Sequence, residues 1–157
     1  MRLAASLLLL SLSAAAHEKG PTARSKPAPD YDKRLSKISE SYGTAIRPIF
    51  EAKCFNCHSD RTEYPWYYKI PGVKQFIDSG IAEAREHLDM SHGFPFKGHR
   101  EDPVEETLKE IGAMIAEGEM PPWYYIPLHG GSRLTDGESK AILAWVKKSR
   151  DLLMWEE

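Results

Sequence analysis

Cysteine is scarce in this sequence, because the 157 residues include only Cys54 and Cys57. A disulfide-rich scaffold needs several bridges, so that class of protein is excluded. An excess of charge of one sign is also missing, since 21 basic and 23 acidic side chains leave a net charge of −2. This balance argues against a nucleic-acid binder and against a polybasic membrane surface. Any partner must recognise a local patch, because the overall charge steers association weakly.

The sequence also lacks an apolar run of roughly 20 residues, the length that crosses a membrane. The apolar run over residues 3–12 is shorter, follows Arg2 and precedes the small residues 14–16. These features predict a signal peptide over residues 1–16, cleaved before His17. We therefore expect a periplasmic protein with no stable membrane span after cleavage. A frayed N-terminal helix and an uncleaved anchor are the alternatives.

Sustained alternation of polar and apolar residues, the pattern of a strand, is missing, whereas apolar residues recur at helical spacing. We expect an all-α domain over residues 33–157, preceded by a flexible, proline-rich linker over residues 17–32. The expected helices cover residues 35–53 (interrupted at Gly43 and Pro48), 73–88, 103–117 and 135–153.

Two capping boxes mark the beginnings of the later helices. Asp102 is expected to cap a helix whose first residue is Pro103, with Glu105 closing the box. Thr135 and Glu138 have the same spacing before the last helix. The segments between helices are instead rich in aromatic residues, proline and glycine. Such segments need a large apolar group at their centre to pack around.

The two cysteines lie in the segment Cys54-Phe55-Asn56-Cys57-His58. Positions i, i+3 and i+4 of a helical turn project from one face. Both thiols can therefore add to the vinyl groups of one haem while the imidazole of His58 ligates its iron, which is the c-type attachment signature. A thioredoxin-like pair would follow a strand, and a structural zinc site would need further ligands. The spacing favours one covalent haem c per chain.

Several segments carry a resemblance to known families. The chain resembles class I cytochromes c in residues 49–58 (their N-terminal helix and haem-attachment turn), 118–121 (their G-x-M-P loop, which supplies a distal methionine) and 134–145 (their C-terminal helix). More narrowly, Cys57-His58-Ser59, Tyr64-Pro65-Trp66-Tyr67 and residues 120–129 are similar to small bacterial proteins grouped as a haem-binding domain family. The resemblance covers residues 44–150 and implies a class I cytochrome c-like helical domain wrapped around haem.

Met120 is the favoured distal iron ligand. It follows Gly118, which is expected to end a helix, and precedes two prolines that restrict the backbone. The alternatives are that Met120 only fills a gap in the core, or that His129 on the same segment is the ligand. The other candidates are Met90, Met114 (expected in the core), Met154, His87, His92 and His99, the last two within a long loop at 91–101 that is expected to cover a haem edge or meet a partner.

The resemblance also implies that a proline carbonyl, from Pro65 or Pro71, accepts a hydrogen bond from the proximal histidine. The candidates for packing on the macrocycle are Trp66, Tyr67, Trp123, Tyr124 and Tyr125, each of which is equally compatible with an ordinary core position.

The predicted function is single-electron transfer between periplasmic redox proteins, with no substrate turned over. A haem-based sensor or small-ligand binder with a displaceable distal ligand is the alternative. Peroxidase-like catalysis ranks last, because the sequence offers no clear distal acid–base pair.

Overall fold

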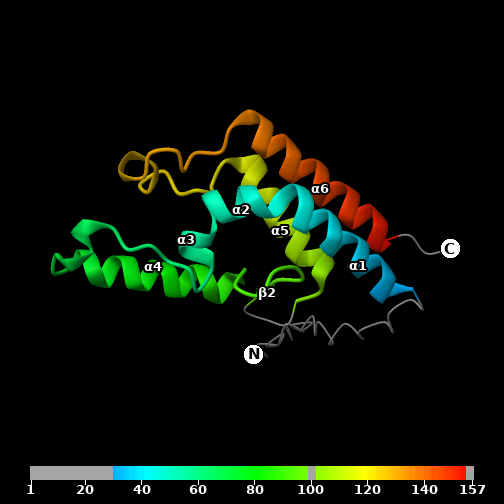
Figure 1. Cartoon of the computed structure of the whole chain (residues 1–157), viewed down its shortest axis with the longest axis horizontal. Coiled ribbons are helices and arrows are strands. Elements are labelled where there is room, and N and C mark those ends of the chain that lie inside the picture. The colour runs from blue at the N-terminus through cyan, green and yellow to red at the C-terminus, as the bar shows by residue number, and fades with distance from the viewer. Residues whose placement is uncertain (1–29, 99–101, 155–157) are drawn as a thin grey trace, which may run out of the picture.

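The computed structural model describes residues 30–98 and 102–154 (Figure 1). The signal peptide predicted over residues 1–16 lies outside the described residues, as does most of the predicted linker. None of the described helices is long and apolar enough to cross a membrane. The described chain is mostly helical, which confirms the all-α prediction.

The elements follow one another in a simple order. They are α1 (Tyr31–Ser41), the π-helical turn η1 (Tyr42–Ile46), α2 (Arg47–Lys53), α3 (Phe55–His58), the 3₁₀ turn η2 (Trp66–Lys69), α4 (Val73–His87), β1 (Leu88–Asp89), β2 (Lys97–Gly98), α5 (Val104–Glu117), the 3₁₀ turn η3 (Ile126–Leu128) and α6 (Asp136–Met154). The two short strands pair antiparallel, with Leu88 opposite Gly98.

The hydrophobic core lies between α1, η1, α2, α5 and α6, which run close together in Figure 1. Tyr42 is at its centre, with its ring 5.2 Å from that of Phe96 and 5.9 Å from those of Phe50 and Trp145, measured between centroids. Helix α4 extends away from this core and packs against α3. The fold therefore presents α3 between a closed helical core and an outlying helix.

The loop after α4 contributes to this core. Phe94 and Phe96 are both buried, and their rings pack edge to face at 5.5 Å. The sequence predicted that a long loop at 91–101 covers a haem edge or meets a partner. Its described part, residues 91–98, contributes two aromatic side chains to the core.

Gly43 and Pro48 do not break the first helical segment. Residues 42–46 widen into a π-helical turn, and the chain continues directly into α2. Pro48 lies in the first turn of α2, at the change from the π-helical turn to the α-helix, a position where proline is tolerated. The interruption predicted from the sequence is therefore a change of helical type within a continuous helical segment.

One predicted capping box is correct and the other is wrong. The backbone N–H of Thr135 donates to Glu138 Oε2 (2.7 Å), and that of Glu138 donates to Thr135 Oγ1 (3.2 Å). At α5, Pro103 has an extended ψ of 144° and is itself the N-cap residue, so the helix begins at Val104. Asp102 therefore lies one residue too early to cap the helix.

Gly112 allows α5 and α6 to approach closely. A Cβ atom at this position would lie 3.1 Å from Cγ1 of Val146 on α6. We expect Gly112→Leu to lower the free energy of unfolding by about 1–3 kcal/mol, the usual cost of overpacking a core. Urea denaturation of the haem-loaded protein followed by circular dichroism measures this change.

Gly80 on α4 supplies a matched control, because a Cβ there would meet no atom within 4 Å. Gly80→Ala should stabilise the protein by up to about 1 kcal/mol through helix propensity. A Gly112→Leu variant as stable as the wild type would contradict the close α5–α6 contact.

Candidate functional site

The predicted attachment residues occupy one helical turn. Cys54 joins α2 to α3, and its carbonyl oxygen accepts the backbone N–H groups of Cys57 (3.1 Å) and His58 (3.0 Å). Both thiols are free and partly buried. Phe55, between them, is buried against the core and anchors the turn. The turn is therefore held by local hydrogen bonds and by one apolar side chain.

The environment of the thiols argues against two other uses of a cysteine pair. Burial, with the neighbouring Cys57, raises the pKa of the Cys54 thiol to about 12, and burial also raises the pKa of Cys57. A redox-active dithiol works through a thiolate of lowered pKa. Within residues 30–98 and 102–154, no cluster of three histidine, cysteine or carboxylate side chains could hold a metal ion. A zinc site at these thiols thus lacks further ligands in this part of the chain.

The imidazole of His58 is oriented by the chain that follows α4. Its Nδ1 lies 2.9 Å from the carbonyl oxygen of Leu88. A carbonyl can only accept, so Nδ1 carries the hydrogen and Nε2 keeps its lone pair. Burial lowers the pKa of His58, and interactions with the backbone of Leu88 and Ala84 partly oppose that shift. A neutral imidazole that keeps the lone pair on Nε2 is the form that ligates a metal.

This contact corrects the prediction of a proline carbonyl. The Pro65 carbonyl accepts the N–H of Tyr68 at 2.9 Å instead. Leu88 reaches His58 because α4 packs on α3 and ends beside it, and the N–H of Met90 donates to the His58 carbonyl at 2.7 Å. No local motif marks Leu88, which lies 30 residues from His58.

Met120 lies on the segment that joins α5 to α6. Gly118 ends α5 in the left-handed conformation (φ 70°), as the sequence predicts. The side chain of Met120 is 36% exposed, whereas Met90 is 3% exposed and belongs to the core. Met114 is half-buried on α5, and Met154 is exposed at the end of α6. Among the methionines that the structure describes, Met120 is thus the one that lies on a loop outside the core.

The two nitrogens of His129, the rival ligand, already have partners. Nδ1 lies 2.9 Å from the carbonyl oxygen of Tyr125, and Nε2 lies 3.2 Å from the hydroxyl of Tyr67. The Tyr125 ring stacks on the imidazole with 3.6 Å between centroids. Ligation of iron by His129 would require the Tyr67 bond to break. Of the other histidines, His87 and His92 are exposed, and His99 lies outside the described residues.

Large apolar side chains are exposed on two segments that face each other. Trp66 is 85% exposed and Trp123 is 82% exposed. The segments touch where the rings of Phe76 and Tyr124 approach to 5.8 Å. Further exposed members are Tyr64, Ile70, Met120 and Leu128, while Tyr67 and Tyr125 are half-buried. Exposed apolar side chains gathered on two segments in contact indicate a candidate binding site, and a large flat apolar group suits it.

The sequence did not single out Phe76, Ile70 or Leu128 for this surface. Phe76 lies on α4, within the helix predicted over residues 73–88, and it is 64% exposed. Periodicity shows that residues share a face, and it does not show whether protein covers that face.

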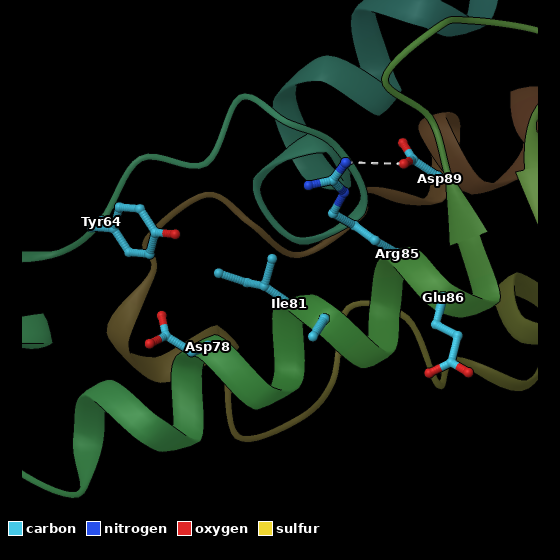
Figure 2. Close-up of a pocket in the computed structure, with 7 residues that line it drawn as sticks. Tyr64, Asp78, Ile81, Arg85, Glu86 and Asp89 are labelled. Carbon is cyan, nitrogen blue, oxygen red and sulfur yellow. Dashed lines mark hydrogen bonds and ion pairs between the residues drawn. The ribbon is translucent and has the colours of Figure 1, made fainter.

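An open cavity of about 430 Å³ lies on another side of α4 (Figure 2). Its lining includes Asp78, Glu86 and Asp89, and Arg85 forms an ion pair with Asp89 at 3.1 Å. The remaining lining residues are Tyr64, Ile81 and Ala82. This lining holds four charged residues and no cysteine, histidine or methionine, so the cavity lacks the predicted iron ligands, although it shares Tyr64 with the exposed apolar segments.

The free thiols, the oriented imidazole and the exposed apolar segments together fit a haem. Residues 18–148 match the family described as "Haem-binding domain". The chain belongs to this family. The haem-binding domain is also 32% identical over 128 residues to the "Cytochrome c peroxidase Ccp" of Escherichia coli (strain K12). The matched segment is 81% of this chain and 26% of that protein, so the domain spans about a quarter of its relative. No solved structure matches the chain.

Family membership confirms the predicted family and the prediction of haem as cofactor. The roles of the individual residues remain predictions that the geometry supports.

Proposed function

We propose that this haem-binding domain carries one haem c and transfers single electrons between periplasmic redox proteins. Thioether bonds from Cys54 and Cys57 hold the haem, and Nε2 of His58 is the proximal ligand. The observation that carries the proposal is one helical turn with two free thiols and an imidazole oriented by Leu88. The bound haem supplies the one-electron iron couple.

The protein's part is to fix and shield the cofactor. The Leu88 carbonyl holds the ring plane of His58 and makes its Nε2 a better donor to iron. The exposed aromatic and aliphatic side chains on residues 64–76 and 120–128 pack on the macrocycle and exclude water from it. Met120, on the second of these segments, is the distal ligand. Methionine favours the ferrous state and raises the reduction potential.

Two other functions differ in what happens at the distal face. In a sensor or small-ligand binder, a diatomic gas displaces Met120, and the exposure of this side chain favours that alternative. In an enzyme, the distal position would be open to peroxide. The name of the E. coli relative mentions peroxidase activity, but the match covers a quarter of that protein. A domain that delivers electrons to a peroxide-reducing partner would agree both with the name of the relative and with a match to only a quarter of it.

Measurements on the wild-type protein, matured with haem in the periplasm, distinguish these functions. We expect its ferrous form to be six-coordinate and to bind carbon monoxide slowly and weakly, because Met120 occupies the distal position. A spectroelectrochemical titration should give one reversible one-electron wave. Stopped-flow mixing of the reduced protein with carbon monoxide measures ligand exchange. Rapid, complete binding of carbon monoxide would favour the sensor, and steady turnover of peroxide would favour an enzyme.

A further inference from the structure

Asn56, the residue before Cys57, connects the attachment turn to the segment that carries Met120. Its side-chain amide NH₂ donates to the hydroxyl oxygen of Tyr125 at 2.8 Å. Tyr125 follows it by 69 residues in the sequence, so this contact is tertiary. Tyr125 lies on the α5–α6 connection, five residues beyond Met120.

The orientation of the Asn56 amide is fixed by its other partner. Oδ1 of Asn56 accepts the backbone N–H of Glu63 at 2.7 Å. Because a backbone N–H can only donate, the oxygen must face Glu63 and the NH₂ group must face Tyr125. The bond to Glu63 therefore holds the amide donor that faces Tyr125. The hydroxyl of Thr62 donates instead to the main-chain carbonyl of Asn56 at 2.9 Å and does not contact the amide.

Tyr125 belongs to a small rigid unit. Its ring stacks on His129 within 5° of parallel, and its carbonyl accepts from Nδ1 of the same imidazole. Nε2 of His129 accepts the hydroxyl of Tyr67, so this unit is also tied to residues 66–69. Backbone turns connect Tyr125 to Pro122 (3.0 Å) and Leu128 to Tyr125 (3.3 Å). Tyr125 is thus held by contacts with His129 and with its own backbone segment, which begins two residues after Met120 at Pro122.

We propose that Asn56 is a positioning residue for Met120: through Tyr125, it holds the distal loop against the same turn that bears the thioethers and the proximal histidine. The inference rests on the proposed function, because it takes Met120 as the distal ligand. A thioether is a weak ligand for iron, so the equilibrium between bound and displaced sulfur depends on how well the loop is held in advance. Asn56 supplies part of that restraint from within the attachment motif.

The test uses the haem-loaded protein and measures displacement of the distal ligand by imidazole. Asn56→Leu removes the donor, and Tyr125→Phe removes the acceptor while keeping the ring stacked on His129. Loss of one hydrogen bond is expected to strengthen apparent imidazole binding about five- to tenfold in either variant. The double variant should show little further change, because both substitutions remove the same bond.

Two further variants separate positioning from general damage to the turn. In Asn56→Asp, a carboxylate oxygen can still accept from Glu63 and the other can accept the Tyr125 hydroxyl, so imidazole binding should return toward the wild-type value. Thr62→Val removes only the hydrogen bond to the main-chain carbonyl of Asn56. The contacts of the Asn56 amide with Glu63 and Tyr125 stay in place, so imidazole affinity should be unchanged. Tyr125→Phe retains the attachment turn intact and serves as the test if Asn56→Leu does not mature.

Failure of the positioning role of Asn56 can be distinguished from failure of the assignment of Met120 as the distal ligand. If Met120→Ala abolishes the sulfur-to-iron charge-transfer band of the ferric protein but Tyr125→Phe and Asn56→Leu bind imidazole like the wild type, the positioning role is wrong and Met120 remains the ligand. If the wild-type protein lacks that band, the ligand assignment fails and the inference fails with it.

Discussion

Replacing Cys54 and Cys57 together with alanine will eliminate covalently bound haem. The chain has no other cysteine, so no other thiol can form a thioether. After denaturing electrophoresis, a stain for haem peroxidase activity should reveal a band in the wild type and none in the double variant. Pyridine haemochrome spectra of the same samples should change from the thioether-type to the vinyl-type position, or disappear.

Single variants refine this result. Cys54→Ala and Cys57→Ala each leave one thiol that can form one thioether, so we expect weaker staining than in the wild type. Gly80→Ala, a substitution on α4 where a Cβ meets nothing within 4 Å, is the control for expression and maturation. A wild-type band that is absent despite co-expression of the c-type maturation machinery would overturn covalent attachment.

Met120→Ala should leave haem attached and the helical core folded, but it should change the coordination and the reduction potential of the iron. Met120 is not among the buried residues that form the hydrophobic core. Without the thioether, the red-region charge-transfer band of the ferric protein should vanish and the reduction potential should fall. Carbon monoxide should then bind the ferrous form rapidly. Optical spectra and potentiometric titration of the purified variant measure each effect.

Met154→Ala is the matched control, because Met154 is also exposed but lies at the end of α6. It should keep the charge-transfer band and the wild-type potential. His129→Ala tests the rival ligand. A ferric spectrum that is unchanged by Met120→Ala and altered by His129→Ala would establish bis-histidine ligation in place of our assignment.

Features that depend on neighbouring residues in the chain were predictable from the sequence. The Thr135–Glu138 capping box and the end of α5 at Gly118 both follow from spacing of a few residues, and both are confirmed. The turn from Cys54 to His58 is equally local, and its helical geometry agrees with the predicted motif. Such features are encoded by hydrogen bonds that the backbone makes within one or two turns.

Features that depend on tertiary packing were not predictable. The partner of His58 Nδ1 is Leu88 because α4 packs along α3, and no pattern in either segment specifies that arrangement. The bond between Asn56 and Tyr125 joins residues with unremarkable local surroundings. The prediction that Asp102 caps α5 was wrong for a local reason. Pro103 is extended, so α5 begins one residue later than predicted.

The hydrogen bond that orients His58 comes from a main-chain oxygen, and this has a consequence for how the site can evolve. Any amino acid at position 88 supplies the same carbonyl, so drift in the side chain leaves the bond in place as long as α4 ends where it does. A substitution at position 88 therefore does not remove the hydrogen bond. For the same reason, comparing residue types among relatives cannot reveal it. Selection on this bond therefore acts through the length and packing of α4, where an inserted or deleted residue would matter more than any exchange.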